Sequence, residues 1–112
     1  MLGYLNSIEE EAVNKLKSLL SLKLGDSFKS LLLYGSKARG DYNKESDIDI
    51  LVVADTIAPE VKDAIRETVL DVQLEYDLPI AVHIRSLDYI SIQKGNPLNL
   101  FIRSIEREGI RV

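Results

Sequence analysis

The sequence predicts an α+β fold with two layers, in which a small mixed, partly antiparallel sheet carries its helices on one face. Two long segments repeat apolar residues every three or four positions, as amphipathic helices do, and short apolar runs rich in β-branched residues lie between them. The order of the segments is helix, strand, strand, helix, strand, helix, helix and a short final strand. Because there is no internal repeat or linker, the 112 residues form one predicted domain, 1–112.

The first helix is predicted over residues 7–24, where apolar side chains recur with the spacing of one helical face. Ser7 and Glu10 have the spacing of a capping box, and the acidic residues 9–11 lie at the positive end of the helix dipole. Gly25 is placed to end the helix. The apolar face consists of Ile8, Ala12, Val13, Leu16, Leu19 and Leu20.

The remaining elements follow from short apolar runs and from the residues at their boundaries. A run stopped by Gly35 is too short for a helix and indicates a buried strand, and the polar, turn-rich residues 37–46 separate it from a second β-rich run. Pro59 suits the first turn of a long helix, and Ser86 suits the cap of a short one. The predicted strands are 31–34, 48–53, 80–85 and 110–112, and the further predicted helices are 59–76, 86–93 and 97–107.

The composition excludes several classes of function. The chain has no cysteine and one histidine, which excludes disulfides, thiolate metal sites, a thiol nucleophile and a histidine-rich zinc site, so any metal must bind oxygen. A net charge of -4 argues against direct, non-specific nucleic-acid binding. No stretch approaches the roughly 20 apolar residues of a membrane span, and the N-terminus lacks a secretory signal, so we expect a cytoplasmic protein without membrane attachment.

Two aspartates stand at the start of the second predicted strand. Asp47 and Asp49 are two residues apart, so the period of a strand places both carboxylates on one face while Ile48 and Ile50 point into the core. Two like charges this close repel each other unless a cation lies between them. Carboxylate oxygens favour Mg²⁺ or Mn²⁺. Asp47 and Asp49 are therefore the candidate metal ligands.

A glycine and a serine follow the first predicted strand directly. Gly35 lets the backbone turn sharply and present its N–H groups to an anion, and the Ser36 hydroxyl adds a donor. Lys37 and Arg39 bring positive charge to the same loop. For Ser36 to face Asp47, the two strands must run antiparallel. A phosphate-binding loop would then face a metal-binding strand, an arrangement suited to phosphoryl or nucleotidyl transfer.

The motif of Gly-Ser, ten residues and then Asp-x-Asp resembles the signature of the minimal nucleotidyltransferases, a branch of the DNA polymerase β nucleotidyltransferase superfamily. The motif covers fifteen residues of this chain. The order of the elements, together with the segment from Asn96-Pro97 to Gly109-Ile110, extends the resemblance to most of the chain. It implies a polymerase β-type nucleotidyltransferase fold.

The resemblance also implies roles for the residues of the motif. Gly35 and Ser36 match the residues that hold the terminal phosphates of ATP or another NTP. Asp47 and Asp49 match the catalytic aspartates that bind Mg²⁺ or Mn²⁺. Arg39 matches a loop arginine and is expected to help in binding phosphate.

The chain departs from the family pattern on the third predicted strand. Catalytically complete members carry a third carboxylate there, which orients or deprotonates the attacking hydroxyl. If the apolar residues of this strand face the core, the cleft is lined by Ala81, His83 and Arg85, none of which is an acid. His83 could act as a base, because imidazole titrates near neutral pH, or it could be a hydrogen-bonded strand residue without a catalytic role. Glu75 and Asp77 would need the chain to bend inward to contribute.

Three functions are compatible with these residues. The resemblance implies, first, an Mg²⁺-dependent nucleotidyltransferase that moves AMP, or another NMP, from an NTP to a hydroxyl of a helical HEPN-type partner protein, as the antitoxin of a toxin–antitoxin pair. The alternative is a nucleotide- or partner-binding module weakened in catalysis by the missing carboxylate. The third is a small-molecule transferase of the antibiotic-modifying kind, for whose substrate domain 112 residues leave no room. The imperfect helical stripe over 61–74 and the apolar residues within 98–105 could contribute to a homo- or hetero-oligomeric interface.

Overall fold

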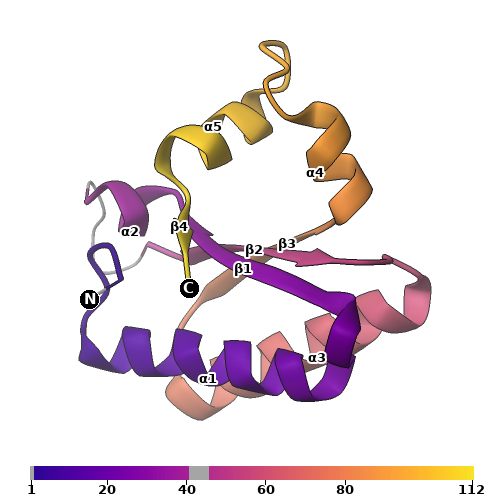
Figure 1. Ribbon diagram of the computed structural model, residues 1–112. Helices are drawn as coiled ribbons and strands as arrows, with labels where there is room; N and C mark the ends of the chain where they lie inside the picture. Colours follow the sequence, from indigo (N-terminus) through magenta and orange to yellow (C-terminus); the bar gives the residue numbers. More distant parts are fainter. Residues whose placement is uncertain (1, 41–45) are drawn as a thin grey trace.

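A four-stranded sheet forms the centre of the computed structural model, which describes residues 2–40 and 46–112 (Figure 1). Residues 41–45 of the predicted turn-rich segment lie outside the described residues. The elements follow one another in the order α1 (Ser7–Leu24), the 3-10 turn η1 (Gly25–Ser27), β1 (Phe28–Tyr34), α2 (Ser36–Arg39), β2 (Ile48–Ala54), α3 (Pro59–Tyr76), β3 (Ile80–Ser86), α4 (Leu87–Gln93), α5 (Leu100–Glu108) and β4 (Ile110–Arg111).

The sheet is mixed, as the sequence predicts. Its strand order is β3-β2-β1-β4, with β1 antiparallel to both β2 and β4 and with β2 parallel to β3. A parallel pair needs a crossover connection, and α3 supplies it. Strand β2 therefore lies between two hydrogen-bonded neighbours, and its first residues meet the end of β1 and the start of β3.

The helices α1 and α3 pack side by side on one face of the sheet (Figure 1). They cover every second side chain of β2, because residues along a strand alternate between its two faces. Full burial of one such Leu, Ile or Val side chain contributes roughly 1.5–3 kcal/mol to stability. The fully buried members of this core are Leu5, Ala12, Val13, Leu16, Leu20, Leu31, Leu33, Ile48, Ile50, Val52, Ile65 and Val72.

The helices α4 and α5 cover the opposite face of the sheet (Figure 1). The α+β fold class is confirmed. The prediction of two layers with the helices on one face holds for α1 and α3 but is wrong for α4 and α5, which add a second helical layer. Its cause is a smaller hydrophobic cluster of Tyr34, Leu51 and Val53, which are buried on that face. Strand β2 is therefore apolar on both faces after its first residues, as a central strand between two layers must be. The side chains that cover the cluster are Leu32, Ile90, Phe101 and Ile105.

Helix α1 has the predicted bounds, but its cap lies one residue earlier. Asn6 and Glu9 form the capping box: Asn6 Oδ1 accepts from the Glu9 N–H at 2.9 Å, and the Asn6 N–H donates to Glu9 Oε1 at 2.9 Å. Asn6 has the extended backbone that a cap requires, whereas Ser7 is already helical. Helix α5 also differs, because Asn99 caps it by accepting from the Ile102 N–H at 3.0 Å, so the helix begins three residues after the predicted start at 97.

The helices differ widely in length. Helices α1 and α3 each have 18 residues, and both match the predicted ranges. Helix α2 has 4 residues, too few for a periodic pattern to reveal it in the sequence. Within residues 2–40 and 46–112, no helix combines the length and the apolar character needed to cross a membrane.

Candidate active site

The two candidate metal ligands lie where β2 begins. Asp49 is the second residue of β2 and lies beside Ala81 of β3, and Asp47 is exposed directly before the strand. Ile48 and Ile50 are fully buried on the other face, so Asp49 points to the side covered by α4 and α5. Burial raises the pKa of Asp49, and the negative charge of Asp47 raises it further. The Asp47 carboxylate is therefore close enough to Asp49 to oppose its ionisation.

Gly35 lies directly against Asp49. Its φ of 76° is a left-handed value that favours glycine, and a Cβ at this position would overlap the Asp49 carboxylate. The predicted antiparallel pairing of β1 with β2 is confirmed, and it brings the end of β1 to the start of β2. Ser36 follows as the first residue of α2, in which the N–H groups of Ala38 and Arg39 donate to the Gly35 carbonyl at 3.0 and 3.1 Å. The fold thus places the Gly35–Ser36 segment against the aspartate end of β2.

Arg39 is held by Glu108, a residue that the sequence does not single out. Arg39 Nη1 donates to Glu108 Oε1 at 2.9 Å and to Oε2 at 3.2 Å, and the Gly35 N–H donates to Oε1 at 3.3 Å. The signal for this contact is indirect. Leu33 of β1 pairs with Ile110 of β4, and two further steps along the same antiparallel register bring Gly35 opposite Glu108. A strand of two residues does not reveal that register in the sequence.

Lys37 does not point into the site with Arg39. Its side chain is almost fully buried, and Nζ donates to Glu9 Oε2 of α1 at 2.7 Å. The prediction that both basic residues charge the same loop is therefore wrong for Lys37. The reason is that residues 36–39 are helical, and side chains two positions apart on a helix diverge by roughly 200°.

Strand β3 presents Ala81, His83 and Arg85 to the same face as Asp49, as the sequence predicts. His83 Nδ1 is hydrogen-bonded with the Tyr34 hydroxyl. Burial, and then the charge of Asp49, raises the pKa of Tyr34 to about 12, so the phenol stays protonated at neutral pH. The imidazole is therefore tied to β1 through one of its two nitrogens.

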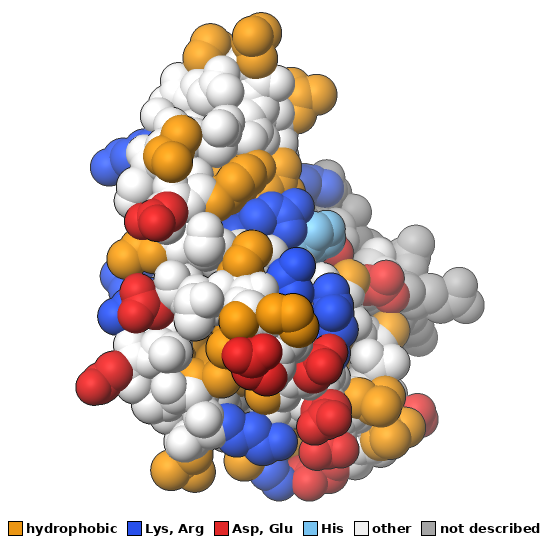
Figure 2. Space-filling view, turned by 90° about the vertical axis from the view of Figure 1, so that its right-hand side faces the viewer, with side chains coloured by type: hydrophobic (Ala, Val, Ile, Leu, Met, Phe, Trp, Pro, Cys, Tyr) orange, Lys and Arg blue, Asp and Glu red, His pale blue; other side chains and the backbone are white. Residues whose placement is uncertain are grey.

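Aromatic rings hold Arg85 above this face of the sheet. Its guanidinium carbon lies 5.1 Å from the centroid of the Phe101 ring and 5.4 Å from that of Tyr89. The Phe101 ring also meets the Tyr34 ring edge to face, with centroids 5.7 Å apart. On the face shown in Figure 2, Lys and Arg side chains gather in the middle, with hydrophobic side chains above them and acidic ones below. The contacts of Arg85 with Tyr89 of α4 and with Phe101 of α5 hold these two helices beside the candidate site.

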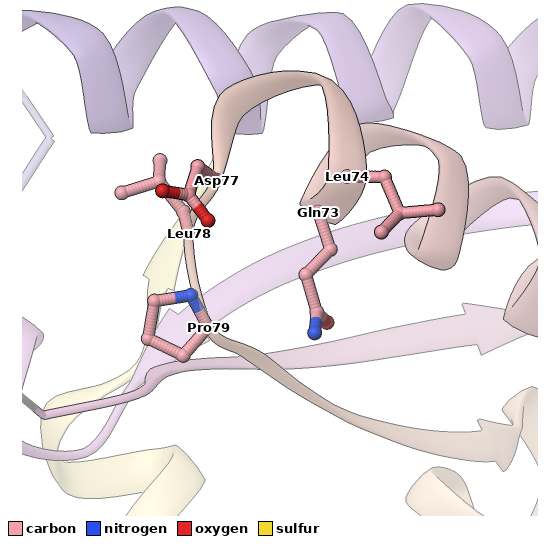
Figure 3. Close-up of a pocket in the computed structure, with 5 residues that line it drawn as sticks. All are labelled: Gln73, Leu74, Asp77, Leu78 and Pro79. Atoms are coloured by element: carbon pink, nitrogen blue, oxygen red, sulfur yellow. The ribbon is translucent and has the colours of Figure 1, made fainter.

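The two acids that precede β3 are directed elsewhere. Lys15 Nζ of α1 donates to both carboxylate oxygens of Glu75, at 2.8 and 2.6 Å. Asp77 ends α3 and lines a pocket of about 300 Å³ together with Gln73 and Pro79 (Figure 3). This agrees with the expectation that the chain would have to bend for either acid to serve as a third carboxylate.

The carboxylates of the candidate site suit a divalent cation that is bound partly by the protein and partly by a substrate. Within residues 2–40 and 46–112, no group of three or more His, Asp or Glu side chains is placed to hold a metal ion by itself. Asp49 of β2 and Asp47, directly before the strand, offer hard carboxylate oxygens close to each other. Mg²⁺ is commonly bound by one or two carboxylates together with substrate phosphates and water. The residues present therefore fit a cation whose coordination is completed by phosphate oxygens.

Sequence comparison connects the chain to known proteins. A model of the nucleotidyltransferase domain family matches residues 10–112. Two proteins of Methanocaldococcus jannaschii that are named as protein adenylyltransferases are similar to this chain. One is 29% identical over 102 residues, which cover 91% of this chain and 96% of the relative. The other is 37% identical over 100 residues, which cover 84% of this chain and 63% of the relative.

Solved structures share the fold. A toxin–antitoxin complex with AMP-PNP aligns with a TM-score of 0.55 and 19% identity, over 87% of this chain and 69% of the other. The complex of a tri-AMPylated HEPN toxin with its MNT antitoxin from Shewanella oneidensis aligns with a TM-score of 0.54 and 19% identity, over 91% and 69%. At this identity the likeness concerns the fold. The family match over residues 10–112, which includes the Gly-Ser and Asp-x-Asp motif, shows that the chain belongs to the nucleotidyltransferase domain family.

Proposed function

We propose that this chain is an adenylyltransferase that moves AMP from ATP, or NMP from another NTP, to a hydroxyl group of a partner protein. The observation that carries the proposal is the contact of Gly35 with Asp49, which sets the predicted phosphate loop against the predicted metal-binding strand. Membership of the nucleotidyltransferase domain family supports the type of reaction. The relatives named as protein adenylyltransferases support a protein as the acceptor.

The proposed partner is a helical HEPN-type protein, with this chain as the antitoxin of the pair. One solved complex with the same fold joins an MNT antitoxin to a tri-AMPylated HEPN toxin. Another is a toxin–antitoxin complex with AMP-PNP, which supports ATP as the donor. A reaction that consumes ATP also suits the cytoplasmic location expected from the sequence.

In the proposed reaction, the oxygen of the acceptor hydroxyl attacks the α-phosphorus of ATP. A bond forms between these two atoms, the bond from the α-phosphorus to the oxygen that bridges to the β-phosphate breaks, pyrophosphate leaves, and the hydroxyl proton passes to a base or to water. The Gly35 N–H, the Ser36 hydroxyl and Arg39 would hold the terminal phosphates. Asp47 and Asp49 would hold Mg²⁺ or Mn²⁺, which neutralises charge on the phosphates when bound.

Label transfer tests this function. The chain is purified with a co-expressed HEPN-type partner and incubated with Mg²⁺ and ATP labelled at either the α- or the γ-phosphate. We expect label on the partner from α-labelled ATP only. Transfer of the γ-label instead would identify a kinase and contradict the proposal.

Two variants test whether transfer depends on the aspartate at the start of β2. Asp49→Asn should lower the transfer of α-label by at least about 100-fold, because it removes a charged ligand of the proposed metal. Asp55→Asn removes the same charge from an exposed position just beyond the other end of the strand and should leave transfer unchanged.

A nucleotide- or partner-binding module with weakened catalysis is the second candidate. One observation favours it: Ala81, and not an acid, lies beside Asp49 on β3. Nucleotide binding and an intact complex without label transfer would support this reading over the first. Ala81→Asp would place a carboxylate beside Asp49, and a gain of label transfer in that variant would show that this group alone is lacking.

A further inference from the structure

The carboxylate of Glu108 occupies the donors that the proposed function assigns to phosphate. Glu108 Oε1 accepts from the Gly35 N–H at 3.3 Å and from Arg39 Nη1 at 2.9 Å, and Oε2 accepts from the same Nη1 at 3.2 Å. Carboxylate and phosphate oxygens both accept charge-assisted hydrogen bonds from guanidinium and backbone N–H groups. Glu108 therefore engages Gly35 and Arg39 as an anionic ligand would.

The fold fixes Glu108 in this position. It is the last residue of α5, and a Cβ on the next residue, Gly109, would lie 2.5 Å from the Ile105 carbonyl oxygen. The Gly109 N–H donates to that same carbonyl at 2.9 Å, and beyond β4 the Val112 N–H donates to the Leu31 carbonyl at 2.9 Å. The Glu108 side chain is only 12% exposed. Its contact with Arg39 is therefore set by the helix end and the strand on either side of it.

Glu108 adds negative charge beside the two aspartates. After burial and Asp47, the charge of Glu108 also raises the pKa of Asp49, whereas His83 and Arg39 lower it. A third carboxylate so close to the aspartates increases repulsion, and its attraction to Arg39 offsets that penalty. A phosphate group approaching Arg39 would be repelled by Glu108 as long as the carboxylate remained there.

We propose that Glu108 is an internal substitute for the nucleotide phosphate, which an incoming NTP must displace from Gly35 and Arg39. The inference rests on the proposed function, because that function assigns the phosphates to these two donors. The affinity for NTP is then lowered by a residue of the chain itself. By linkage, an NTP that displaces Glu108 also removes the hydrogen bonds of Glu108 with Gly35 and Arg39. Bound NTP therefore weakens the contact between α5 and the segment of Gly35 and α2.

Calorimetric binding of AMP-PNP with Mg²⁺ tests the inference on the wild-type chain and two variants. Glu108→Gln keeps the length of the side chain but removes the charge that competes with phosphate, so its Kd should be about fivefold lower than that of the wild type. Glu106→Gln is the matched control. Glu106 lies on the same helix and also accepts from a backbone N–H, that of Gly95 at 2.7 Å. This variant removes an equal charge from a side chain with a similar hydrogen bond, and its Kd should not change.

A Kd of Glu108→Gln equal to or higher than that of the wild type would overturn the inference while nucleotide binding, and with it the proposed function, still stands. Absence of AMP-PNP binding in the wild type and in every variant would overturn both the inference and the proposed function. Glu108→Asp guards against loss of the fold in the amide variant, which thermal unfolding would detect. The aspartate side chain is one methylene group shorter, so its carboxylate lies further from Gly35 and Arg39. The Glu108→Asp variant should therefore also bind AMP-PNP more tightly than the wild type.

Discussion

Gly35 meets two separate demands at the end of β1. Its φ of 76° and ψ of -156° lie in a region that is essentially restricted to glycine, where a side chain adds roughly 1–3 kcal/mol of strain. The space that a Cβ would need is taken by the Asp49 carboxylate. Gly95 has nearly the same φ, 77°, but no atom lies within 4 Å of the position of its Cβ. Both glycines thus have a positive φ, but only at Gly35 is the position of a Cβ occupied by another side chain.

Gly35→Ala should destabilise the protein more than Gly95→Ala. The change at Gly95 adds backbone strain of about 1 kcal/mol. The change at Gly35 adds the overlap with Asp49 as well, so we expect a loss of about 2–4 kcal/mol together with loss of nucleotide binding. Urea unfolding of the wild type and the two variants measures the losses of stability, and calorimetric binding of AMP-PNP measures the loss of nucleotide binding. Equal losses in the two variants would contradict the close contact of Gly35 with Asp49.

The Tyr34 hydroxyl makes stability depend on pH in alkaline solution. Burial, and then the charge of Asp49, raises its pKa from 10.0 to about 12, so the folded chain keeps a proton that the unfolded chain loses. The stabilisation that results is complete below a pH of about 10, the value for an unfolded chain, and is lost as the pH rises through about 12.

Tyr34→Phe should remove this dependence. At neutral pH the variant lacks the hydrogen bond to His83 and should be less stable than the wild type by about 1 kcal/mol. Because phenylalanine does not titrate, the difference in unfolding free energy should narrow and then change sign as the pH rises from about 10 to about 12. Denaturant unfolding at several pH values measures it. A difference that stays constant over this range would contradict the raised pKa of Tyr34.

The long helices could be predicted from the sequence because their signals are local. Helices α1 and α3 have the predicted bounds, and Gly25 and Pro59 mark the end of one and the start of the other. The layer of α4 and α5 on the second face could not be predicted in this way. It depends on which side chains of β1 and β2 remain uncovered once α1 and α3 have packed, and that is a property of contacts between distant segments.

The ion pair of Lys37 with Glu9 is a second contact between distant segments, here between two helices, that could not be predicted from the sequence. The sequence places Lys37 in a basic loop, whereas α2 turns its side chain toward α1, 28 positions earlier in the chain. Lys37 is 3% and Glu9 5% exposed. Two charges so well buried depend on each other, because either one left without the other would remain in surroundings of low polarity.

Lys37→Met should destabilise the protein by about 3–5 kcal/mol, since Glu9 would keep a buried charge without this partner. Lys15→Met is the matched control: it breaks a pair with Glu75 whose side chains are 42% and 50% exposed, and should change stability by no more than about 1 kcal/mol. Urea unfolding compares the variants. A small and equal effect of both changes would contradict the burial of the Lys37–Glu9 pair.

At the scale of the whole molecule, the candidate site joins residues that the sequence shows together with residues that only the fold brings to them. Gly35, Asp47 and Asp49 could be predicted because one stretch of chain carries them at a recognisable spacing. Glu108 contacts Gly35 across 73 positions, and His83 contacts Tyr34 across 49. No local pattern encodes such pairs, because they depend on the register of β4 against β1 and on the placing of β3 beside β2.

Nucleotide should stabilise the folded chain only when a divalent cation is present. At an AMP-PNP concentration about 100 times its Kd, the free energy of unfolding should rise by about 2.7 kcal/mol with Mg²⁺. The rise should largely disappear in EDTA and in Asp49→Asn. Thermal unfolding over a series of AMP-PNP concentrations measures it. Equal stabilisation with Mg²⁺ and with EDTA would contradict the proposed metal site.

Glu9 uses its two carboxylate oxygens for two different structures. Oε1 accepts from the Asn6 N–H and closes the cap of α1, and Oε2 accepts from Lys37 of α2, the helix that begins at Ser36. Helix ends fray, and the effect is usually confined to the last turn. Here it would disturb the loop that carries Gly35 and Ser36. A change that removes the cap at Asn6 should therefore also disturb the Gly35–Ser36 segment, which is distant from Asn6 in the sequence.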